Sequence, residues 1–374
     1  MNATPIPQLT GLRTVGAVWV VMLHTLSLTI ALWPEWSKVS RLALGGNLGV
    51  DLFFLLSGFI ITHNYLADLG TGSVRRALHF WGLRLARLYP VFLLAMVAWA
   101  VFLIMQSPRE SGLFDGALSP RNVVMNLLLL NHVPPASSIA STSWSVCLEF
   151  GAYLAFPFLA VLLVRIRSAL LAAALAAAVL AGGVLLLIRL DVQSFEFFTY
   201  RVGWVRLAFE FLAGCLLYVA WSLSGRWREG RSWDIAFVAA AIGIVYACWH
   251  EDPNHPGFFP LAAVPLLAVV VVACAGSTGV VRSLFSTGPM MWMGRISYSL
   301  YMTHFFTLAL ITNGLHEWWV RWPPPAVVRD VTPILIFAVI IAVAAGVYHL
   351  VEEPARRRLR HTVDRLGPRV RSDG

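Results

Sequence analysis

The sequence contains few charged residues. Asp, Glu, Lys and Arg make up 13% of the 374 residues, whereas 58% are apolar. So little charge cannot cover the surface of a soluble protein of this size, which excludes the soluble globular class. No polar stretch between the apolar runs is long enough to form a separate soluble domain. We therefore predict an integral membrane protein.

Cysteine is scarce as well. Cys147, Cys215, Cys248 and Cys274 lie singly within apolar runs, without CxxC spacing or a neighbouring histidine cluster. This pattern favours small buried side chains and predicts no metal site. The first apolar run, 14–33, is too long for a signal-peptide core, and no small-residue cleavage site follows it, so we expect it to be retained.

Long apolar runs recur along the whole chain. About 20 helical residues cross a hydrocarbon core of about 30 Å. A further apolar piece, 123–130, is too short to cross and precedes a polar stretch, so it predicts a re-entrant or interfacial helix. The expected fold class is all-α integral membrane, with about ten transmembrane helices plus this short one. The ten predicted spans are 14–33, 47–66, 88–105, 144–164, 168–188, 203–221, 234–250, 259–276, 296–314 and 331–350.

Lys and Arg are distributed unevenly over the loops. With a cytoplasmic N-terminus, 19 fall in inside loops and 8 in outside loops, and Arg206, within a span, completes the 28. This bias favours both termini in the cytoplasm. The net charge of +9 then reflects membrane topology rather than a nucleic-acid partner. We expect a transmembrane domain over 1–350 and a basic cytoplasmic tail over 351–374.

Ionisable side chains inside the predicted spans need an explanation, because each costs at least a few kcal/mol at bilayer depth. Arg13 and His24 are eleven residues apart, close to three helical turns, so they share one face of the first span. Arg13 then lies at the cytoplasmic edge and His24 near the bilayer centre. The alternative interpretation of His24 is a histidine that only satisfies packing.

Two carboxylates lie at a depth from which they could approach His24. Asp51 is about one turn inside the second span, and Glu149 has a similar place in the fourth. Either is a candidate to orient the imidazole. Asp51 is explained equally by a helix N-terminal charge that the macrodipole favours.

Three polar residues of the ninth span, Ser297, Tyr301 and His304, are spaced i, i+4 and i+7 and form a stripe on one helical face. Packing hydrogen bonds explain such a stripe as well as a functional role does. In the sixth span, Arg206 and Glu210 are spaced i, i+4, so a mutual salt bridge is a sufficient explanation, and we leave both out of the site.

Arg84 and Arg87 share one helical face just before the predicted third span. Two guanidinium groups on one face suit a phosphate-rich ligand, because each can bind phosphate oxygens bidentately. Ordinary positive-inside charge, or binding of anionic lipid, is the alternative.

Several ordered motifs resemble acyltransferase family 3, membrane-bound enzymes that modify bacterial surface carbohydrates and other acceptors. They are LTGLRTVGAVWVVMLH at 9–24, GVDLFFLLSGFIIT at 49–62, RLARLYP at 84–90, STSWSVCLEFGAY at 141–153, GRISYSLYMTH at 294–304 and VEEPARRR at 351–358. The resemblance implies about ten helices with cytoplasmic termini. The sequence departs from the family pattern at four positions. These are Thr10, Thr14, Phe150 and Thr303, where the family often has Asp, Gly, a second carboxylate and Trp, respectively.

The resemblance also implies an activity and a site. We expect an O-acyltransferase that moves an acyl group, namely acetyl, from cytoplasmic acyl-CoA to a hydroxyl of a surface or exported carbohydrate, free or lipid-linked. The expected location is a bacterial inner membrane, where lipids surround the protein. We expect the enzyme to use no metal. A transporter or flippase is the alternative. The predicted catalytic residues are His24, Glu149 and Asp51, and the predicted donor-binding residues are Arg13, Arg84, Arg87, Tyr301 and His304.

Some relatives carry a fused periplasmic domain that completes the transfer. Only 24 residues follow the last predicted span, and they are strongly basic. We therefore expect a standalone form that transfers directly to its acceptor or relies on a separate periplasmic partner.

Overall fold

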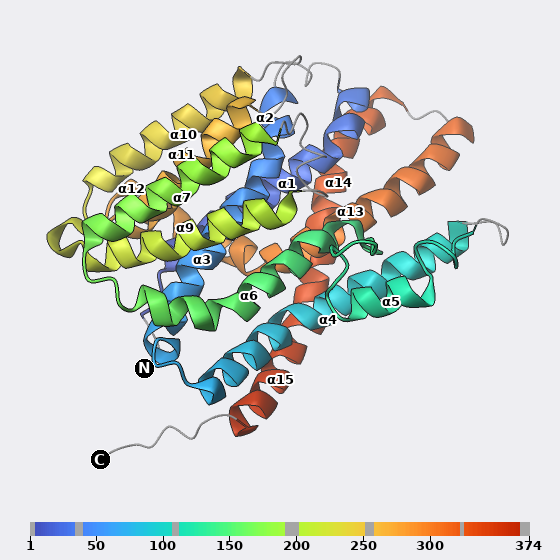
Figure 1. The fold of residues 1–374 in the computed structure, drawn as a ribbon. Coiled ribbons are helices and arrows are strands. Elements are labelled where there is room, and N and C mark those ends of the chain that lie inside the picture. The colour runs from blue at the N-terminus through green and yellow to red at the C-terminus, as the bar shows by residue number, and fades with distance from the viewer. Residues whose placement is uncertain are drawn as a thin grey trace.

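The described residues of the computed structural model, 4–33, 40–106, 112–190, 202–250, 258–321 and 325–366, are mostly helical and form no strand (Figure 1). Each of the predicted spans overlaps one long helix, which confirms the all-α class. The long helices are α1 (Pro7–Leu32), α3 (Leu48–Leu69), α4 (Val74–Gln106), α6 (Trp144–Leu163), α7 (Ala169–Arg189), α9 (Gly203–Leu223), α10 (Ser232–Trp249), α11 (Phe258–Gly276), α13 (Gly288–Arg321) and α14 (Ala326–Val347).

Shorter elements connect or extend these helices. They are α2 (Ser40–Leu44), η2 (Gly45–Asn47), α5 (Pro120–Leu127), η3 (Ser141–Ser143), η4 (Gly225–Trp227), α12 (Val280–Phe285), η5 (Tyr348–Glu352) and α15 (Glu353–Leu366).

Eight helical segments among the described residues are long and apolar enough to cross a membrane, which confirms an integral membrane fold. The apolar part of α11, Leu261–Gly276, is shorter, and α13 carries the polar stripe of the ninth predicted span. The number of ten spans and the cytoplasmic location of the termini stay predictions.

Helices α3 and α9 pack so closely that their backbones touch. A Cβ on Gly58 would lie 2.1 Å from the carbonyl oxygen of Phe211, and a Cβ on Gly214 would lie 2.2 Å from that of Leu55. Only glycine allows this reciprocal approach, as at many helix crossings in membranes. The contact fixes α3 between α9 and α1, which packs against both α3 and α13.

Helix α4 begins 14 residues before the predicted span, so Arg84 and Arg87 lie inside a continuous helix of 33 residues rather than in a loop. Helix α15 packs along the first half of α4: Val363 covers Gly82, and His79 Nε2 lies 2.9 Å from Asp364 Oδ1. The predicted boundary at residue 350 therefore falls within a helix that continues from α14 through η5 into α15. Residues 367–374 of the predicted tail lie outside the described residues.

The short predicted helix is α5, whose eight residues span about 12 Å at 1.5 Å per residue, too little to cross. Ser119 caps its N-terminus by accepting a hydrogen bond from the backbone N–H of Asn122. After α5 the chain runs through buried polar residues, including Asn131 and Ser143, before it enters α6. Whether α5 is re-entrant or interfacial stays a prediction.

Candidate active site

His24 and His304 lie side by side, although 280 residues separate them in sequence. His304 Nε2 is 3.1 Å from His24 Nδ1. His304 Nδ1 lies 2.7 Å from the carbonyl oxygen of Tyr301, and His24 Nδ1 lies 2.9 Å from that of Val20. The parallel packing of α1 on α13 makes this contact. It gives the half-exposed ring of His24 a fully buried histidine as its partner.

These distances favour one placement of the protons on both rings. A carbonyl oxygen only accepts, so the Nδ1 atom of His304 and that of His24 each carry a proton. His304 Nε2 then presents a lone pair to the His24 Nδ1–H. His24 Nε2 is left with a free lone pair, which is the form a proton acceptor needs.

A cavity of about 50 Å³ lies between α1, α3, α6 and α13. Arg13 reaches it from α1, donates from Nε to Ser297 Oγ at 3.1 Å and has its guanidinium carbon 5.7 Å from the centre of the Phe53 ring. The predicted polar stripe therefore faces this cavity at Ser297 and Tyr301. Neither His24 nor His304 lines it, so the predicted contact of His304 with the donor is not part of this arrangement.

Glu149 also lines the cavity, but it does not orient His24. Its Oε1 accepts a hydrogen bond from Ser57 Oγ at 2.8 Å and a short one from the Tyr153 hydroxyl. In the described part of the chain, the ring nitrogens of His24 bond only to Val20 and His304. The predicted pairing of Glu149 with the imidazole is therefore wrong, whereas its predicted position at the site fits.

Asp51 was the other candidate to orient His24, and the structure places it elsewhere. Its Oδ1 and Oδ2 accept hydrogen bonds from Arg206 Nε at 2.8 Å and Nη2 at 2.7 Å, with both side chains 3% exposed. Glu210, the partner predicted for Arg206, accepts no hydrogen bond among the described residues, although its charge acts on Arg206 together with that of Asp51. Helical spacing predicted Glu210 because it compares only residues on the same helix. Asp51 lies on another helix, α3, and the close crossing of α3 and α9 brings it to Arg206.

Arg84 and Arg87 point into the bundle beside the carboxylates. Arg84 Nη2 donates to the Tyr65 hydroxyl at 2.5 Å, and its guanidinium carbon is 4.9 Å from the centre of that ring. Arg84 Nε is buried without a hydrogen-bond partner among the described residues. The charges of Glu149 and Glu352 act on Arg87. Free donor capacity therefore remains next to the cavity.

Glu352 is a residue that sequence reasoning missed, because it lay in the predicted tail. It is 2% exposed, and its Oε2 accepts a hydrogen bond from Ser299 Oγ at 2.6 Å. Its charge acts on both Arg13 and Arg87. The signal that could have found it is the motif at 351–358, which begins directly after the last span. Three arginines and two carboxylates therefore meet here, with an excess of positive charge.

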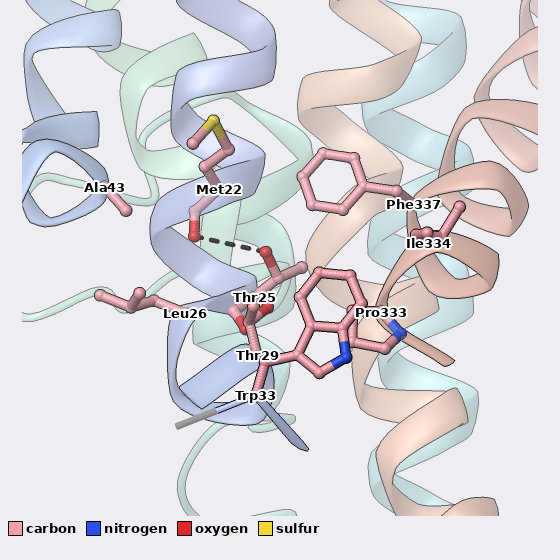
Figure 2. Close-up of a pocket in the computed structure, with 9 residues that line it drawn as sticks. All are labelled: Met22, Thr25, Leu26, Thr29, Trp33, Ala43, Pro333, Ile334 and Phe337. Atoms are coloured by element: carbon pink, nitrogen blue, oxygen red, sulfur yellow. Dashed lines mark hydrogen bonds between the residues drawn. The ribbon is translucent and has the colours of Figure 1, made fainter. Parts of the chain in front are cut away.

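A second cavity, of about 270 Å³, lies on the other side of α1, between α1, α2 and α14. Phe337 and Ile334 of α14 line it together with Met22 and Thr25 of α1, and Figure 2 shows the ring of Phe337 pointing towards α1. Thr25 donates its hydroxyl to the backbone of its own helix. The cavity therefore offers apolar surface and no ionisable group. Its lining consists of Met22, Thr25, Leu26, Thr29, Trp33, Ala43, Pro333, Ile334 and Phe337.

Comparison with known families identifies the class of protein. The family described as an acyltransferase domain, acyltransferase family 3, matches residues 6–349. The chain therefore belongs to this family of membrane acyltransferases. No group of three or more His, Cys, Asp or Glu that could hold a metal occurs among the described residues.

Three curated relatives illustrate the similarity. YrhL of Bacillus subtilis, provisionally named a peptidoglycan O-acetyltransferase, is 26% identical over 94% of this chain and 55% of its own length. The peptidoglycan O-acetyltransferase OatA of Listeria monocytogenes is 25% identical over 83% of this chain and 50% of its own. A provisionally named O-acetyltransferase of Staphylococcus aureus strain COL is 24% identical over 94% and 57%. The chain thus spans about half the length of the relatives it matches. No solved structure matches it significantly.

Proposed function

We propose that this chain transfers an acyl group, acetyl in the first instance, from cytoplasmic acyl-CoA to a hydroxyl of a surface or exported carbohydrate in a bacterial inner membrane. The observation that carries the proposal is the arrangement of the site. A cavity lined by Arg13 and Glu149 has Arg84 and Arg87 beside it, and His24, which lies on the same helix as Arg13, has an unshared lone pair. Relatives named as O-acetyltransferases support the same chemistry.

The donor side of the proposal follows from charge. The phosphates of CoA are anionic, and guanidinium groups bind phosphate oxygens through strong paired hydrogen bonds. Arg84 and Arg87 hold these phosphates where α4 enters the bundle from the predicted cytoplasmic side. Arg13 lies further along the path of the pantetheine arm, towards His24.

The chemical step is acyl transfer with His24 as general base. The acceptor oxygen attacks the thioester carbonyl carbon while His24 Nε2 takes the hydroxyl proton. A new C–O bond forms, the C–S bond breaks, and the CoA thiolate leaves with the electron pair and receives that proton. Such base catalysis is worth typically about 10² to 10⁴-fold. His304 holds His24 in the tautomer that this step requires.

A variant of this step passes through an acyl-histidine. In it, His24 Nε2 attacks the thioester carbonyl carbon, the C–S bond breaks, and CoA leaves as the thiolate, which takes up the proton of the acylated ring. The acceptor hydroxyl then attacks the acyl-imidazole, the N–C bond breaks, and the hydroxyl proton returns to the released histidine. The two routes use the same tautomer of His24. A quenched reaction without acceptor separates them, because only the second route leaves labelled acyl groups on the protein.

The acceptor is a carbohydrate in this proposal. The relative OatA is named for peptidoglycan, which contains glycan strands. The apolar cavity between α1 and α14 suits the hydrocarbon chain of a lipid-linked saccharide, because it contains no ionisable group. A separate periplasmic protein that assists transfer is compatible with this arrangement.

The test is transfer of a radiolabelled acetyl group. Purified protein in lipid nanodiscs is incubated with labelled acetyl-CoA and a set of candidate glycans, and the label in each glycan is counted. We expect label in at least one glycan with the active protein and about 10²-fold less, or lower still, with His24→Ala. Labelled acetyl-CoA that binds but is never consumed with any hydroxyl acceptor would refute the proposal.

A further inference from the structure

A third cavity lies away from the catalytic histidine, between the segment after α4 and the start of α5. It has a volume of about 360 Å³. The positive-inside distribution of charge predicts that these segments face the outside of the membrane. The cavity is polar, unlike the one between α1 and α14. Its polar lining consists of Asp115, Ser119, Arg121, Asn122 and Ser137.

Buried asparagines make the floor of this cavity rigid. Asn122 donates from Nδ2 to the carbonyl oxygen of Ala117 at 2.7 Å, and its Oδ1 accepts from the Ser137 backbone N–H at 2.9 Å. Asn126 holds the same loop by accepting from the backbone N–H of Ile139 at 3.0 Å. Two separate loops are thereby fixed against α5, so the cavity is formed before any ligand arrives.

Hydrogen-bonding groups of both kinds remain free on its walls. Within the described part of the chain, neither Asp115 nor Arg121 makes an ion pair or a side-chain hydrogen bond, and both are exposed. The hydroxyls of Ser119 and Ser137 act only as acceptors in their contacts with Asn122, so their protons are available. One carboxylate and one guanidinium cancel in charge, while the wall offers donors and acceptors together.

We propose that this outer cavity binds a neutral saccharide segment of the acceptor, an inference that rests on the proposed function. Vicinal hydroxyls of a sugar both donate and accept, so they match a carboxylate, a guanidinium and two serine hydroxyls. Asp115 would repel an anionic ligand, and Arg121 would repel a cationic one. Phe114, next to Asp115 in the chain, is 61% exposed, and an exposed aromatic side chain near the cavity suits the apolar face of a sugar.

The cavity wall is connected to the catalytic region. After Ser137 the chain runs to Ser143, whose hydroxyl accepts from Asn131 Nδ2 at 3.1 Å, and then enters α6. On α6, Ser145 donates to the hydroxyl of Tyr301, which lines the central cavity. A saccharide held at the outer cavity thus rests on the segment that leads to the reaction site.

The experiment measures binding of chitohexaose, a neutral hexasaccharide, to protein in nanodiscs, with hexagalacturonate as the anionic counterpart. The test variant is Asp115→Ala with Arg121→Ala. The matched control is Asp68→Ala with Arg76→Ala, an exposed pair at the predicted cytoplasmic side. We expect the test variant to weaken chitohexaose binding by about tenfold or more, since hydrogen bonds to charged groups are lost. The control variant should bind like the wild type, and acyl-CoA affinity should be the same in all three proteins.

The outcomes separate this inference from the proposed function. Equal chitohexaose affinity in wild type and test variant, preferential binding of hexagalacturonate, or no binding of chitohexaose at millimolar concentration would each overturn the saccharide site. Glycan acetylation with an unchanged acceptor KM in the test variant would overturn the site and leave the function standing. Saccharide binding through Asp115 and Arg121 without any acyl transfer would support the site and refute the function. Both residues are exposed, so neither substitution should disturb folding. Asp115→Asn is a second variant, which removes the charge of Asp115 and keeps the size of the side chain.

Discussion

Two groups of buried charge in this protein differ in how completely the protein itself satisfies them. Asp51 and Arg206 meet in bidentate geometry and are almost fully buried. Arg84 and Arg13 keep partial exposure, contact aromatic rings and hydroxyls, and leave donor capacity free beside a cavity. A charge paired within the protein holds helices together, whereas one with unused donors can bind a ligand. Charge at bilayer depth therefore points to function where unused donors lie beside a cavity.

The largest effect should come from His24, the proposed general base. We expect His24→Ala to reduce transfer by about 10²-fold or more, because the proton acceptor is lost. Its unfolding temperature and CoA affinity should stay close to those of the wild type. Initial rates with labelled acetyl-CoA and the accepted glycan measure the loss. Activity above about a tenth of wild type would remove His24 from the role of general base.

Breaking the paired group should affect stability. Asp51→Ala leaves Arg206 buried without its bidentate partner, and removing one member of a buried pair costs about 3 to 5 kcal/mol. Thermal unfolding of the purified protein measures this loss. The control variant replaces Asp51 by Leu, Arg206 by Met and Glu210 by Gln, which leaves no unpaired charge and should recover most of the stability. If Asp51→Ala instead kept the wild-type stability and lost activity, Asp51 would belong to the catalytic machinery.

The arginines beside the cavity should affect ligand binding. We expect Arg84→Ala with Arg87→Ala to weaken CoA binding by at least about tenfold, because charge-assisted contacts to phosphate are lost. Lys at both positions should recover only part of the affinity, since an ammonium keeps the charge but lacks the bidentate fork. Titration of purified protein with CoA gives both numbers. Unchanged affinity in the double Ala variant would exclude the clamp and leave membrane topology as the role of the pair.

The smallest effect should come from Glu352. It is buried like Asp51, and its charge acts on the arginines beside the cavity. Glu352→Gln keeps a hydrogen-bonding partner for Ser299 and removes a negative charge that acts on Arg13 and Arg87. We expect CoA to bind about two- to fivefold tighter, because one competitor for the guanidinium groups is lost. The same titration detects it, with Glu353→Gln as the neighbouring control. Weaker binding would mean that Glu352 orients the arginines rather than competing with phosphate.

Sequence predicted the helices well, because hydropathy over about 20 residues is a local property. It placed the start of α4 too late, since the first turns of that helix carry charge and lie outside the apolar run. The partners of the buried charges could not be predicted from the sequence. Arg206 is 155 residues from Asp51, and His304 is 280 residues from His24, whereas spacing rules compare only residues on one helix.

In the candidate site, too, the sequence predicted individual residues but not the contacts between helices. Arg13, Glu149 and Tyr301 were predicted and line one cavity. Glu352 was missed because composition assigned its segment to a basic tail, and only the continuation of α14 into α15 brings it inside. The pairing of His24 with His304 rather than with a carboxylate depends on how α1 is rotated against α13, and the sequence of either helix alone does not determine that rotation.

The π-helical turn η5 has a consequence for the direction in which the following helix faces. A π turn accommodates one more residue than an α turn, so each residue added there rotates everything beyond it by about 100°. With the extra residue, Glu352 faces Ser299 while Val363 and Asp364 meet α4. Without it, α15 would present a different side to α4. Tyr348–Glu352 thus sets the angular phase of the C-terminal helix, and thereby determines which of its side chains enter the bundle.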